Sequence, residues 1–169
     1  MSTSTINIRV TGTDKLSPEI LAAVRAGEEM GTEKICIRGV ELIVPLTPVA
    51  FGVLAGAMQY AQLDSPMHMI IFAGAPADVY AAPVETGTRP HFPPSSALIP
   101  WVVQKLGVKN EKQAASIAFA IARAISERGT KGAFMFERTF EQLQNEAPGI
   151  LELEIATAIR NAGLAGANA

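Results

Sequence analysis

The stretch VLAGAMQYAQLDSPMHMIIFAG, residues 53–74, contains two segments rich in apolar and β-forming residues with a turn sequence between them. The segments are Val53–Leu63 and Met67–Gly74, and the turn sequence is Asp64-Ser65-Pro66. Asp and Ser side chains hydrogen-bond the backbone of a turn, and Pro fixes one of its φ angles. The stretch therefore predicts a β-hairpin.

A long helix is predicted before this hairpin. Ser17-Pro18-Glu19 is typical of a helix start, because Ser caps the first turn, Pro fits it, and Glu complements the helix dipole. An apolar stripe begins at Ile20, and the helix is expected to end near Pro45. Small residues on this helix predict close packing against another element: Ala23, Gly27 and Gly31.

Helical patterns return in the second half of the chain. Glu111–Arg128 is the clearest, since Ile117, Ile121 and Ile125 lie four apart and Gly129 supplies a C-cap. Further helices are predicted at Ala97–Leu106, with Pro100 in its first turn and Gly107 at its end, and at Arg138–Gln144 and Ile150–Asn161, which Pro148-Gly149 separates.

The remaining segments complete the predicted fold. Ile6–Val10 alternates apolar and polar residues and predicts a strand, whereas Ala75–Ser96 predicts a loop with a short helical turn near Val79–Val84. Together the patterns predict an α+β fold, with a small antiparallel sheet, a long N-terminal helix and several shorter helices packed on it. The length of 169 residues suits a single domain, 1–169.

The composition is apolar for a protein that buries its core alone. Hydrophobic residues make up 49% of the chain and charged residues only 18%, and there are 27 Ala and 14 Gly. The charged fraction of globular domains is usually about a quarter. Since small apolar side chains let backbones approach closely, this composition favours a protein that completes its burial against neighbouring subunits.

The sequence also bears on compartment. The single cysteine, Cys36, excludes an intramolecular disulfide, and the N-terminus lacks the pattern of a signal peptide, so a reducing cytoplasm is expected. No charged residue lies between Glu41 and Asp64, but Pro45 and Pro48 in this run argue against a membrane-spanning helix.

Charge is unevenly distributed along the chain. Residues 1–84 carry 5 Lys/Arg and 8 Asp/Glu, residues 85–140 carry 8 and 4, and residues 141–169 carry 1 and 4, so the net charges are −3, +4 and −3. This order suits subunits that meet head to tail, although solvated faces of differing charge give the same pattern.

No residue pattern predicts catalysis. His68 and His91 lack the spacing of a metal site, Cys36 is expected to be a buried thiol, and close carboxylates such as Glu152 and Glu154 are expected to face solvent. The motifs of a nucleophilic serine and of a phosphate-binding loop are absent. We therefore predict no catalytic residue, metal or cofactor.

A rigid segment follows the hairpin and is the predicted contact surface. Three prolines, Pro90, Pro93 and Pro94, restrict the segment 84–94, and Gly87 supplies a turn, so docking it costs little entropy. Trp101, Phe134 and Phe136 are expected to anchor it to the core. The predicted subunit or partner contacts are Glu85, Thr86, Gly87, Thr88, Arg89, Pro90, His91, Phe92, Pro93 and Pro94.

Several segments, in order, resemble a known family, the minor tail components of tailed bacteriophages, also called tail-completion or head–tail joining proteins. Pro48–Ala57 resembles its A-P-V-D-T-G-x-L-x-x-S segment, except that Ala50-Phe51 replaces Asp-Thr, and Tyr80–Thr88 is similar to its Y-A-x-x-V-E-x-G-T motif. One branch of the family is matched by three further segments: Pro93–Gly107, Ile117–Thr130 and Phe134–Glu137. The resemblance covers roughly three-quarters of the chain, residues 17–147, and leaves out the C-terminal helix and small-residue tail, 148–169.

The resemblance implies a structural protein of the virion neck, assembled in the host cytoplasm, with no catalysis. Its subunits would form a ring, most often a hexamer, between the head connector and the tail terminator or tail tube. Genomic DNA would pass through the lumen without sequence-specific contact. The protein would have no membrane partner. Basic residues expected to face the lumen or a partner are Lys105, Lys109, Lys112, Arg128 and Lys131.

Two other function classes remain open on the sequence alone. A cytosolic DNA-binding or regulatory module would use the basic segment 85–140. Its basic residues are spread out and the sequence pI is about 5.7, which is not typical of a dedicated DNA-binding protein. A small hydrolase is third, because the patterns of a nucleophile or a metal site are missing.

Overall fold

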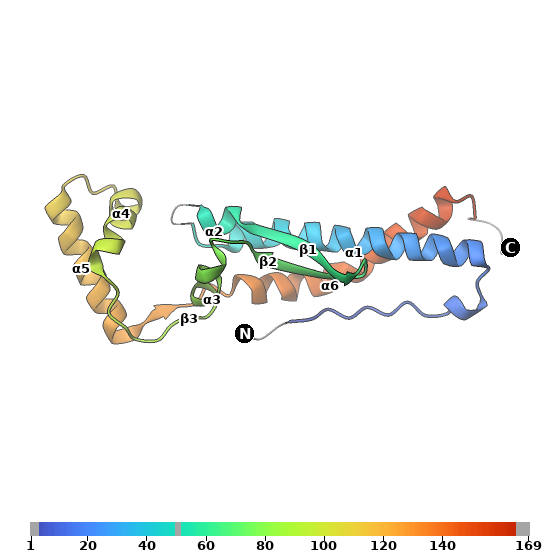
Figure 1. Cartoon of the computed structure of the whole chain (residues 1–169), viewed down its shortest axis with the longest axis horizontal. Helices are drawn as coiled ribbons and strands as arrows, with labels where there is room; N and C mark the ends of the chain where they lie inside the picture. The colour runs from blue at the N-terminus through green and yellow to red at the C-terminus, as the bar shows by residue number, and fades with distance from the viewer. Residues whose placement is uncertain (1–3, 50–51, 165–169) are drawn as a thin grey trace. The chain divides into compact units, whose positions relative to one another are not determined.

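The computed structural model describes residues 4–49 and 52–164 (Figure 1). Helices combined with short antiparallel strands confirm the predicted α+β class and its long N-terminal helix. The elements, in chain order, are η1 (Thr13–Lys15), α1 (Pro18–Leu46), α2 (Val53–Gly56), β1 (Met58–Ser65), β2 (His68–Ala73), α3 (Asp78–Thr86), β3 (Gly87–Thr88), α4 (Ser95–Leu106), α5 (Glu111–Arg128), β4 (Thr130–Lys131) and α6 (Met135–Asn161).

The chain forms two compact units. Unit 1 consists of the described parts of segments 1–44, 58–72 and 136–169, and unit 2 consists of those of segments 45–57 and 73–135. The chain passes between the units more than once, and a compact unit is not the same as an independently folding domain. The single domain 1–169 therefore stays a prediction. Within the described residues, no helix combines the length and apolar character that crossing a bilayer requires.

Unit 1 is built on the antiparallel pairing of α1 with α6, which lie side by side in Figure 1. Glycines on α1 bring the two helices together. A Cβ atom added at Gly27 would lie 2.5 Å from the Ile155 Cα atom, and one at Gly31 would lie 2.7 Å from the Leu151 Cδ1 atom. The predicted close packing along the small residues of this helix is therefore confirmed.

The β1–β2 hairpin completes unit 1. A Cβ atom at Gly39 would overlap the Ile71 side chain of β2 and would lie 3.1 Å from the Leu143 Cδ2 atom of α6. The missing side chain of Gly39 therefore makes room for both elements. The next turn of α1 places Ile43 in the core, where it is fully buried.

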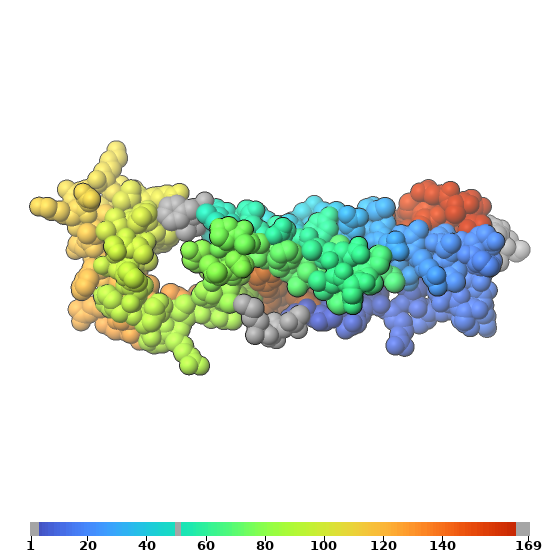
Figure 2. Space-filling model, in the orientation of Figure 1, coloured from blue at the N-terminus to red at the C-terminus, as the bar shows by residue number. Residues whose placement is uncertain are grey.

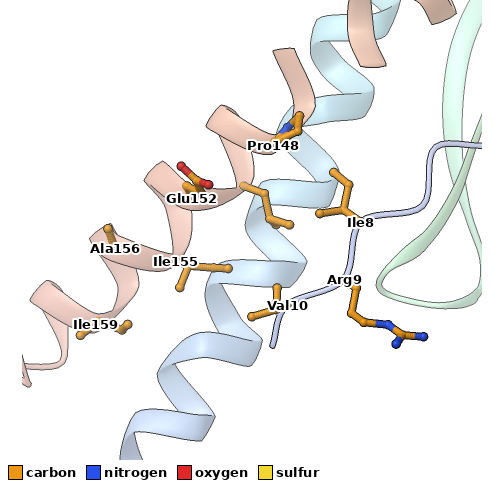
Figure 3. A pocket seen from close by; sticks show the side chains of 9 residues that line it. Ile8, Arg9, Val10, Pro148, Glu152, Ile155, Ala156 and Ile159 are labelled. Atoms are coloured by element: carbon orange, nitrogen blue, oxygen red, sulfur yellow. The ribbon is translucent and has the colours of Figure 1, made fainter. Parts of the chain in front are cut away.

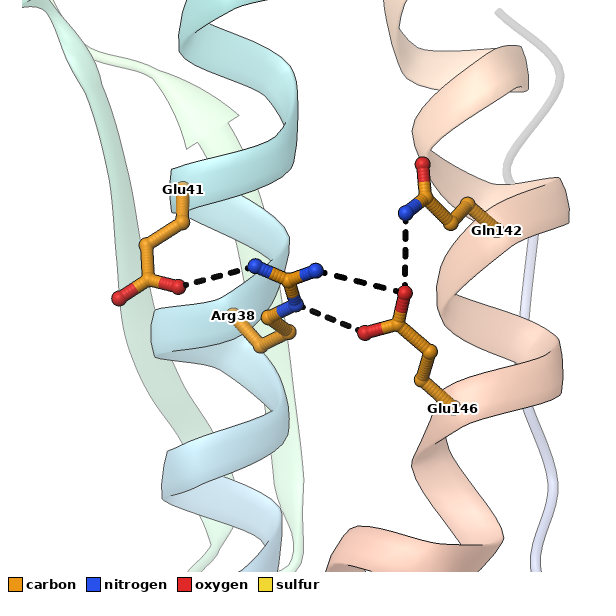
Figure 4. Close-up of polar contacts among 4 residues, drawn as sticks. All are labelled: Arg38, Glu41, Gln142 and Glu146. Atoms are coloured by element: carbon orange, nitrogen blue, oxygen red, sulfur yellow. Dashed lines mark hydrogen bonds and ion pairs between the residues drawn. The ribbon is translucent and has the colours of Figure 1, made fainter.

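Polar pairs border the α1–α6 interface (Figure 4). The Arg38 guanidinium donates from Nε to Glu146 Oε2 at 2.7 Å and from Nη1 to Glu41 Oε2 at 3.3 Å, and Gln142 donates to Glu146 Oε1 at 2.9 Å. One turn earlier on α1, Lys34 Nζ lies 2.7 Å from Glu154 Oε1. Glu154 is buried, so the prediction that it faces solvent was wrong, because Lys34 reaches it from α1.

Unit 2 contains a short ribbon and a helical hairpin. In the ribbon, Gly87 pairs with Lys131 and Thr88 with Thr130, antiparallel. In the helical hairpin, α4 packs on α5 around three fully buried residues, Val102, Ala114 and Ala118. Half-buried side chains close around them: Leu98, Ile99, Trp101, Val108, Ile117 and Ile121.

Some predicted elements were correct. α5 spans the predicted Glu111–Arg128, with the Asn110 side chain accepting a hydrogen bond from the Gln113 N–H and Gly129 at the C-cap. α4 ends as predicted before Gly107, whose φ is 65°. It begins at Ser95, however, so Pro100 lies beyond its first turn, contrary to the prediction.

Other predicted elements were wrong. Ile6–Val10 is extended but belongs to no strand, and Val53–Gly56 is the short helix α2 instead of the start of a strand. The helix predicted to break at Pro148-Gly149 is continuous as α6, because its buried residues on both sides of the proline pack in one interface with α1. The β3–β4 ribbon was not predicted.

Candidate interaction surfaces

The ten residues predicted as a contact loop belong to three different elements of unit 2. Glu85 and Thr86 are the last residues of α3, and Gly87 and Thr88 form β3. Only the segment 89–94 is an extended connection, leading into α4. Its exposed residues are Arg89, Pro90, His91, Phe92 and Pro94, whereas Pro93 is half-buried. The exposed part of the predicted contact surface is therefore shorter than the sequence indicated.

Hydrogen bonds donated by backbone N–H groups hold the first half of this segment in place. The Phe134 N–H donates to the Glu85 carbonyl at 3.0 Å, and the Thr88 N–H donates to Thr130 Oγ1 at 3.0 Å. Gly87 has φ 78°, and a Cβ atom there would overlap the Thr130 carbonyl oxygen. Gly87 is therefore required by the ribbon itself, and a side chain there is expected to disturb the fold of unit 2.

The second half of the segment carries an aromatic pair. The Phe92 ring packs on Phe119 of α5 with the ring centroids 5.9 Å apart and the planes tilted by 60°. Both side chains remain more than half exposed, at 54% and 56%. His91 Nδ1 lies 2.9 Å from the Arg89 carbonyl oxygen, so this side chain bonds the backbone of its own segment. The sequence pattern did not indicate that Phe119 is part of this surface.

The predicted aromatic anchors have separate positions. Trp101 is half-buried against the α4–α5 core. Phe134 is 40% exposed and has φ 51°, at the point where the chain leaves the ribbon and enters α6. Its attachment to the predicted segment is the backbone hydrogen bond to Glu85. A role of Trp101, Phe134 and Phe136 as one anchor for the segment stays a prediction.

The predicted basic residues form two groups. Lys105, Lys109 and Lys112 lie around the connection between α4 and α5, whereas Arg128 and Lys131 follow at the other end of α5, about 27 Å of helix away. All five are exposed, and none forms an ion pair within the described part of the chain. Side chains of the α4–α5 connection, yellow to orange in Figure 2, project from the surface of unit 2.

The two units differ in net charge. Unit 1 contains 7 Lys/Arg and 12 Asp/Glu, which gives −5, and unit 2 contains 7 and 4, which gives +3. Residues that are far apart in sequence contribute to the acidic unit, since α1 and α6 both carry carboxylates. The acidic, basic and acidic segments of the sequence are therefore gathered in the structure into one acidic and one basic unit.

A groove in unit 1, between α1 and the β1–β2 hairpin, was not predicted from the sequence. Its volume is about 640 Å³, and it is lined by both apolar and acidic side chains. The Tyr60 hydroxyl donates to Glu33 Oε1 at 3.3 Å, and desolvation together with this carboxylate raises the pKa of Tyr60. The lining residues are Ala26, Glu29, Met30, Glu33, Tyr60, Ala61, Gln62, Pro66 and Met69.

A second groove in unit 1 lies beside α6 and has a volume of about 370 Å³ (Figure 3). The extended N-terminal segment forms one wall. Ile8 and Val10 point toward α6 and line the groove together with Leu151, Ile155 and Ile159, whereas Arg9 points away (Figure 3). The side chains therefore alternate in direction as the predicted strand requires, but the segment lies beside a helix and not beside another strand.

Hydrogen bonding and burial shift the pKa values of the Asp64 and Cys36 side chains in unit 1. His68 Nδ1 forms a hydrogen bond with the exposed Asp64 carboxylate, and this bond lowers the pKa of the Asp64 carboxyl. Cys36 is buried as expected, and this burial, followed by the Glu33 charge, raises the pKa of its thiol. Within residues 4–49 and 52–164, no three His, Cys, Asp or Glu side chains group as a metal site would require.

Comparison of the chain with protein-family models, curated proteins and solved structures gave no match. The candidate surfaces are therefore assigned from the chain's own residues: the aromatic pair and basic residues of unit 2, and the two grooves of unit 1.

Proposed function

We propose that the chain is a structural subunit of a tailed-phage neck, a tail-completion protein that forms a ring and acts by shape and contact. The observation that carries this proposal is the opposite net charge of the two units, −5 and +3. A surface of one sign on one copy and of the other sign on the next favours a head-to-tail interface. Such interfaces close into rings when the rotation between copies permits.

Exposed apolar side chains support assembly. Met30, Leu63 and Met67 in unit 1 are at least half exposed. In unit 2 they include Val79, Tyr80, Leu106 and the Phe92–Phe119 pair. Apolar side chains that gather on a surface rimmed by polar residues mark protein–protein contact sites. They agree with the expectation, drawn from composition, that burial is completed between subunits.

The family resemblance supports the same function. Its motifs at Tyr80–Thr88, Pro93–Gly107 and Ile117–Thr130 correspond in this chain to α3–β3, α4, and α5 with the start of β4. They therefore fall on the unit that carries the aromatic pair. The departure at Ala50-Phe51 lies outside the described residues.

Native mass spectrometry with negative-stain microscopy tests the proposal directly. The purified chain is expected to give closed rings whose mass is a multiple of 17.8 kDa, with six copies most frequent. High salt should weaken the ring, because exposed charges are screened. A 17.8 kDa monomer at every protein concentration and salt concentration would contradict a ring-forming subunit.

A DNA-binding module is the second candidate, favoured by the exposed Lys105, Lys109 and Lys112 around one connection. Three phosphate contacts would give a plot of log affinity against log salt concentration with a slope of about −2.7. Fluorescence anisotropy with a labelled duplex measures this slope. If the duplex does not bind at low salt, this alternative is wrong and the neck proposal is unaffected.

A further inference from the structure

The groove between α1 and the hairpin of unit 1 combines features that suit a cationic, aromatic partner. Glu29 and Glu33 lie one turn apart on α1, both exposed, and neither forms an ion pair within the described residues. The nearby cations Lys34 and Arg38 pair with Glu154 and Glu146 of α6, and the exposed Arg25, one turn before Glu29, forms no ion pair within the described residues. The groove therefore keeps uncompensated negative charge at its edge.

The apolar lining of the same groove offers soft, adaptable side chains. Met30 is 50% exposed at its edge, and Met69 and Tyr60 line it from the hairpin. Methionine fills irregular gaps and makes favourable contacts with aromatic rings. A groove of about 640 Å³ has room for large side chains of a partner.

Unit 2 presents a surface with the complementary chemistry. Four exposed residues of α5, Lys112, Ser116, Phe119 and Arg123, follow one another at spacings of four, three and four, so they form a single stripe on the helix. Phe119 is near the middle of this stripe, with Phe92 packed on it. Arg123 is engaged only by Glu127 among the described carboxylates, at 3.4 Å and in an exposed position where such a pair contributes little free energy.

We propose that the α5 stripe of one copy docks in the α1–hairpin groove of the next copy, with the Phe92–Phe119 pair among the methionines and Lys112 and Arg123 facing Glu29 and Glu33. This inference rests on the proposed ring. The occupant is a second copy because the docking partners have opposite charge and both surfaces are present in every chain. The contact joins different surfaces on the two copies, so it propagates from copy to copy until a ring closes.

Charge reversal in two complementary variants tests the contact. A groove variant carries Glu29→Lys and Glu33→Lys, and a stripe variant carries Lys112→Glu and Arg123→Glu. Each variant alone places like charges at the contact, so its mass in native mass spectrometry should fall to that of the 17.8 kDa monomer. An equimolar mixture of the two places opposite charges at each contact and should restore rings of alternating copies.

A matched control reverses the same charge elsewhere on unit 1. Asp14→Lys with Glu141→Lys replaces two exposed acidic residues that line neither groove, and it should leave rings intact. Circular dichroism of every variant checks that the fold is retained. The four residues changed in the groove and stripe variants are exposed, so the spectra of both variants should match that of the unchanged chain.

The outcomes separate the inference from the proposed function. If the unchanged chain forms rings and both charge-reversed variants also form them, the docking contact is wrong while the ring stands. If each variant is monomeric and the mixture stays monomeric, the partner of the groove is something other than the stripe of a second copy, and the inference is again wrong. If the unchanged chain forms no assembly, the proposed function fails as well.

Discussion

Units 1 and 2 bring their helices together with different residues. In unit 1, Gly27 and Gly31 of α1 touch α6 with almost no side chain between the backbones. In unit 2, Ala114 and Ala118 of α5 are fully buried against α4. In both units the small residues face inward, and larger side chains such as Met30 and Phe119 are left at the surface. Close helix packing thus frees large apolar side chains for contacts outside the unit.

The largest effect on stability is expected from filling the glycine contact of unit 1. Gly27→Leu would drive a side chain into the backbone of α6 at Ile155 and should lower the free energy of unfolding by about 3 kcal/mol. Chemical denaturation followed by circular dichroism measures the change. The matched control is Gly149→Ala on α6, where a Cβ atom meets nothing within 4 Å and a gain of roughly 0.5–1 kcal/mol in helix propensity is expected. Equal stability of the two variants would refute the glycine contact.

A smaller loss is expected in unit 2. Ala118→Leu enlarges a fully buried side chain next to Val102 and should cost about 2 kcal/mol, less than the glycine substitution because the α4–α5 core is bordered by half-buried side chains that can shift. Ala120→Leu, on the exposed side of the same helix, is the control and should change stability by less than about 0.5 kcal/mol. If Ala118→Leu cost more than Gly27→Leu, the contrast between the units would be reversed.

Acid should affect unit 1 through its carboxylates. Hydrogen bonds from Arg38 and Gln142 lower the pKa of Glu146 below its ordinary value of 4.5. The stabilisation from this carboxylate is therefore complete above pH 4.5 and is lost as the pH falls through the lower value of the folded state. Unfolding titrations between neutral and acid pH should show a smaller loss of stability for Glu146→Gln than for the unchanged chain. Identical pH profiles would mean that the pair with Arg38 does not contribute.

The smallest effect on stability is expected at the surface of α5. Phe119→Ser removes a ring that is 56% exposed, so the free energy of unfolding should change by roughly 0.5 kcal/mol or less. The same variant should fail to form rings, while Phe119→Leu should retain them. A large loss of stability would show that the ring of Phe119 serves the fold of unit 2 instead of a contact between copies.

The sequence predicted elements whose signals are local. α5 was predicted with correct bounds because its apolar spacing and its C-cap all lie within the helix. α6 was not, because Pro148 and Gly149 are local signals for a break, whereas the burial of Leu151 against Gly31 depends on a helix more than a hundred residues away. Such packing outweighs local propensity and is invisible in the sequence of α6 alone.

The candidate surfaces followed the same division. Phe92 was predicted to be a contact residue from its Pro-rich surroundings, but its partner Phe119 lies on another element and was missed. The groove of unit 1 joins Glu29 and Glu33 to Tyr60 and Met69, and no spacing in the sequence indicates that these elements meet. The basic residues are exposed, but their facing a lumen or a partner stays a prediction, and the sequence did not indicate the two groups into which α5 separates them.

The contacts of Gly27, Gly31 and Gly39 with α6 are spaced by four and then eight residues along each helix, so a slip of one helical turn would again place α1 glycines opposite the same ridge of α6. The spacing of these glycine contacts alone therefore does not distinguish the two alignments. The ion pairs do: after such a slip toward the N-terminus of α6, Arg38 would face Gln142 and Lys34 would face Ile150. The ion pairs Arg38–Glu146 and Lys34–Glu154 therefore set the register of α1 against α6, because they form in only one of the two alignments.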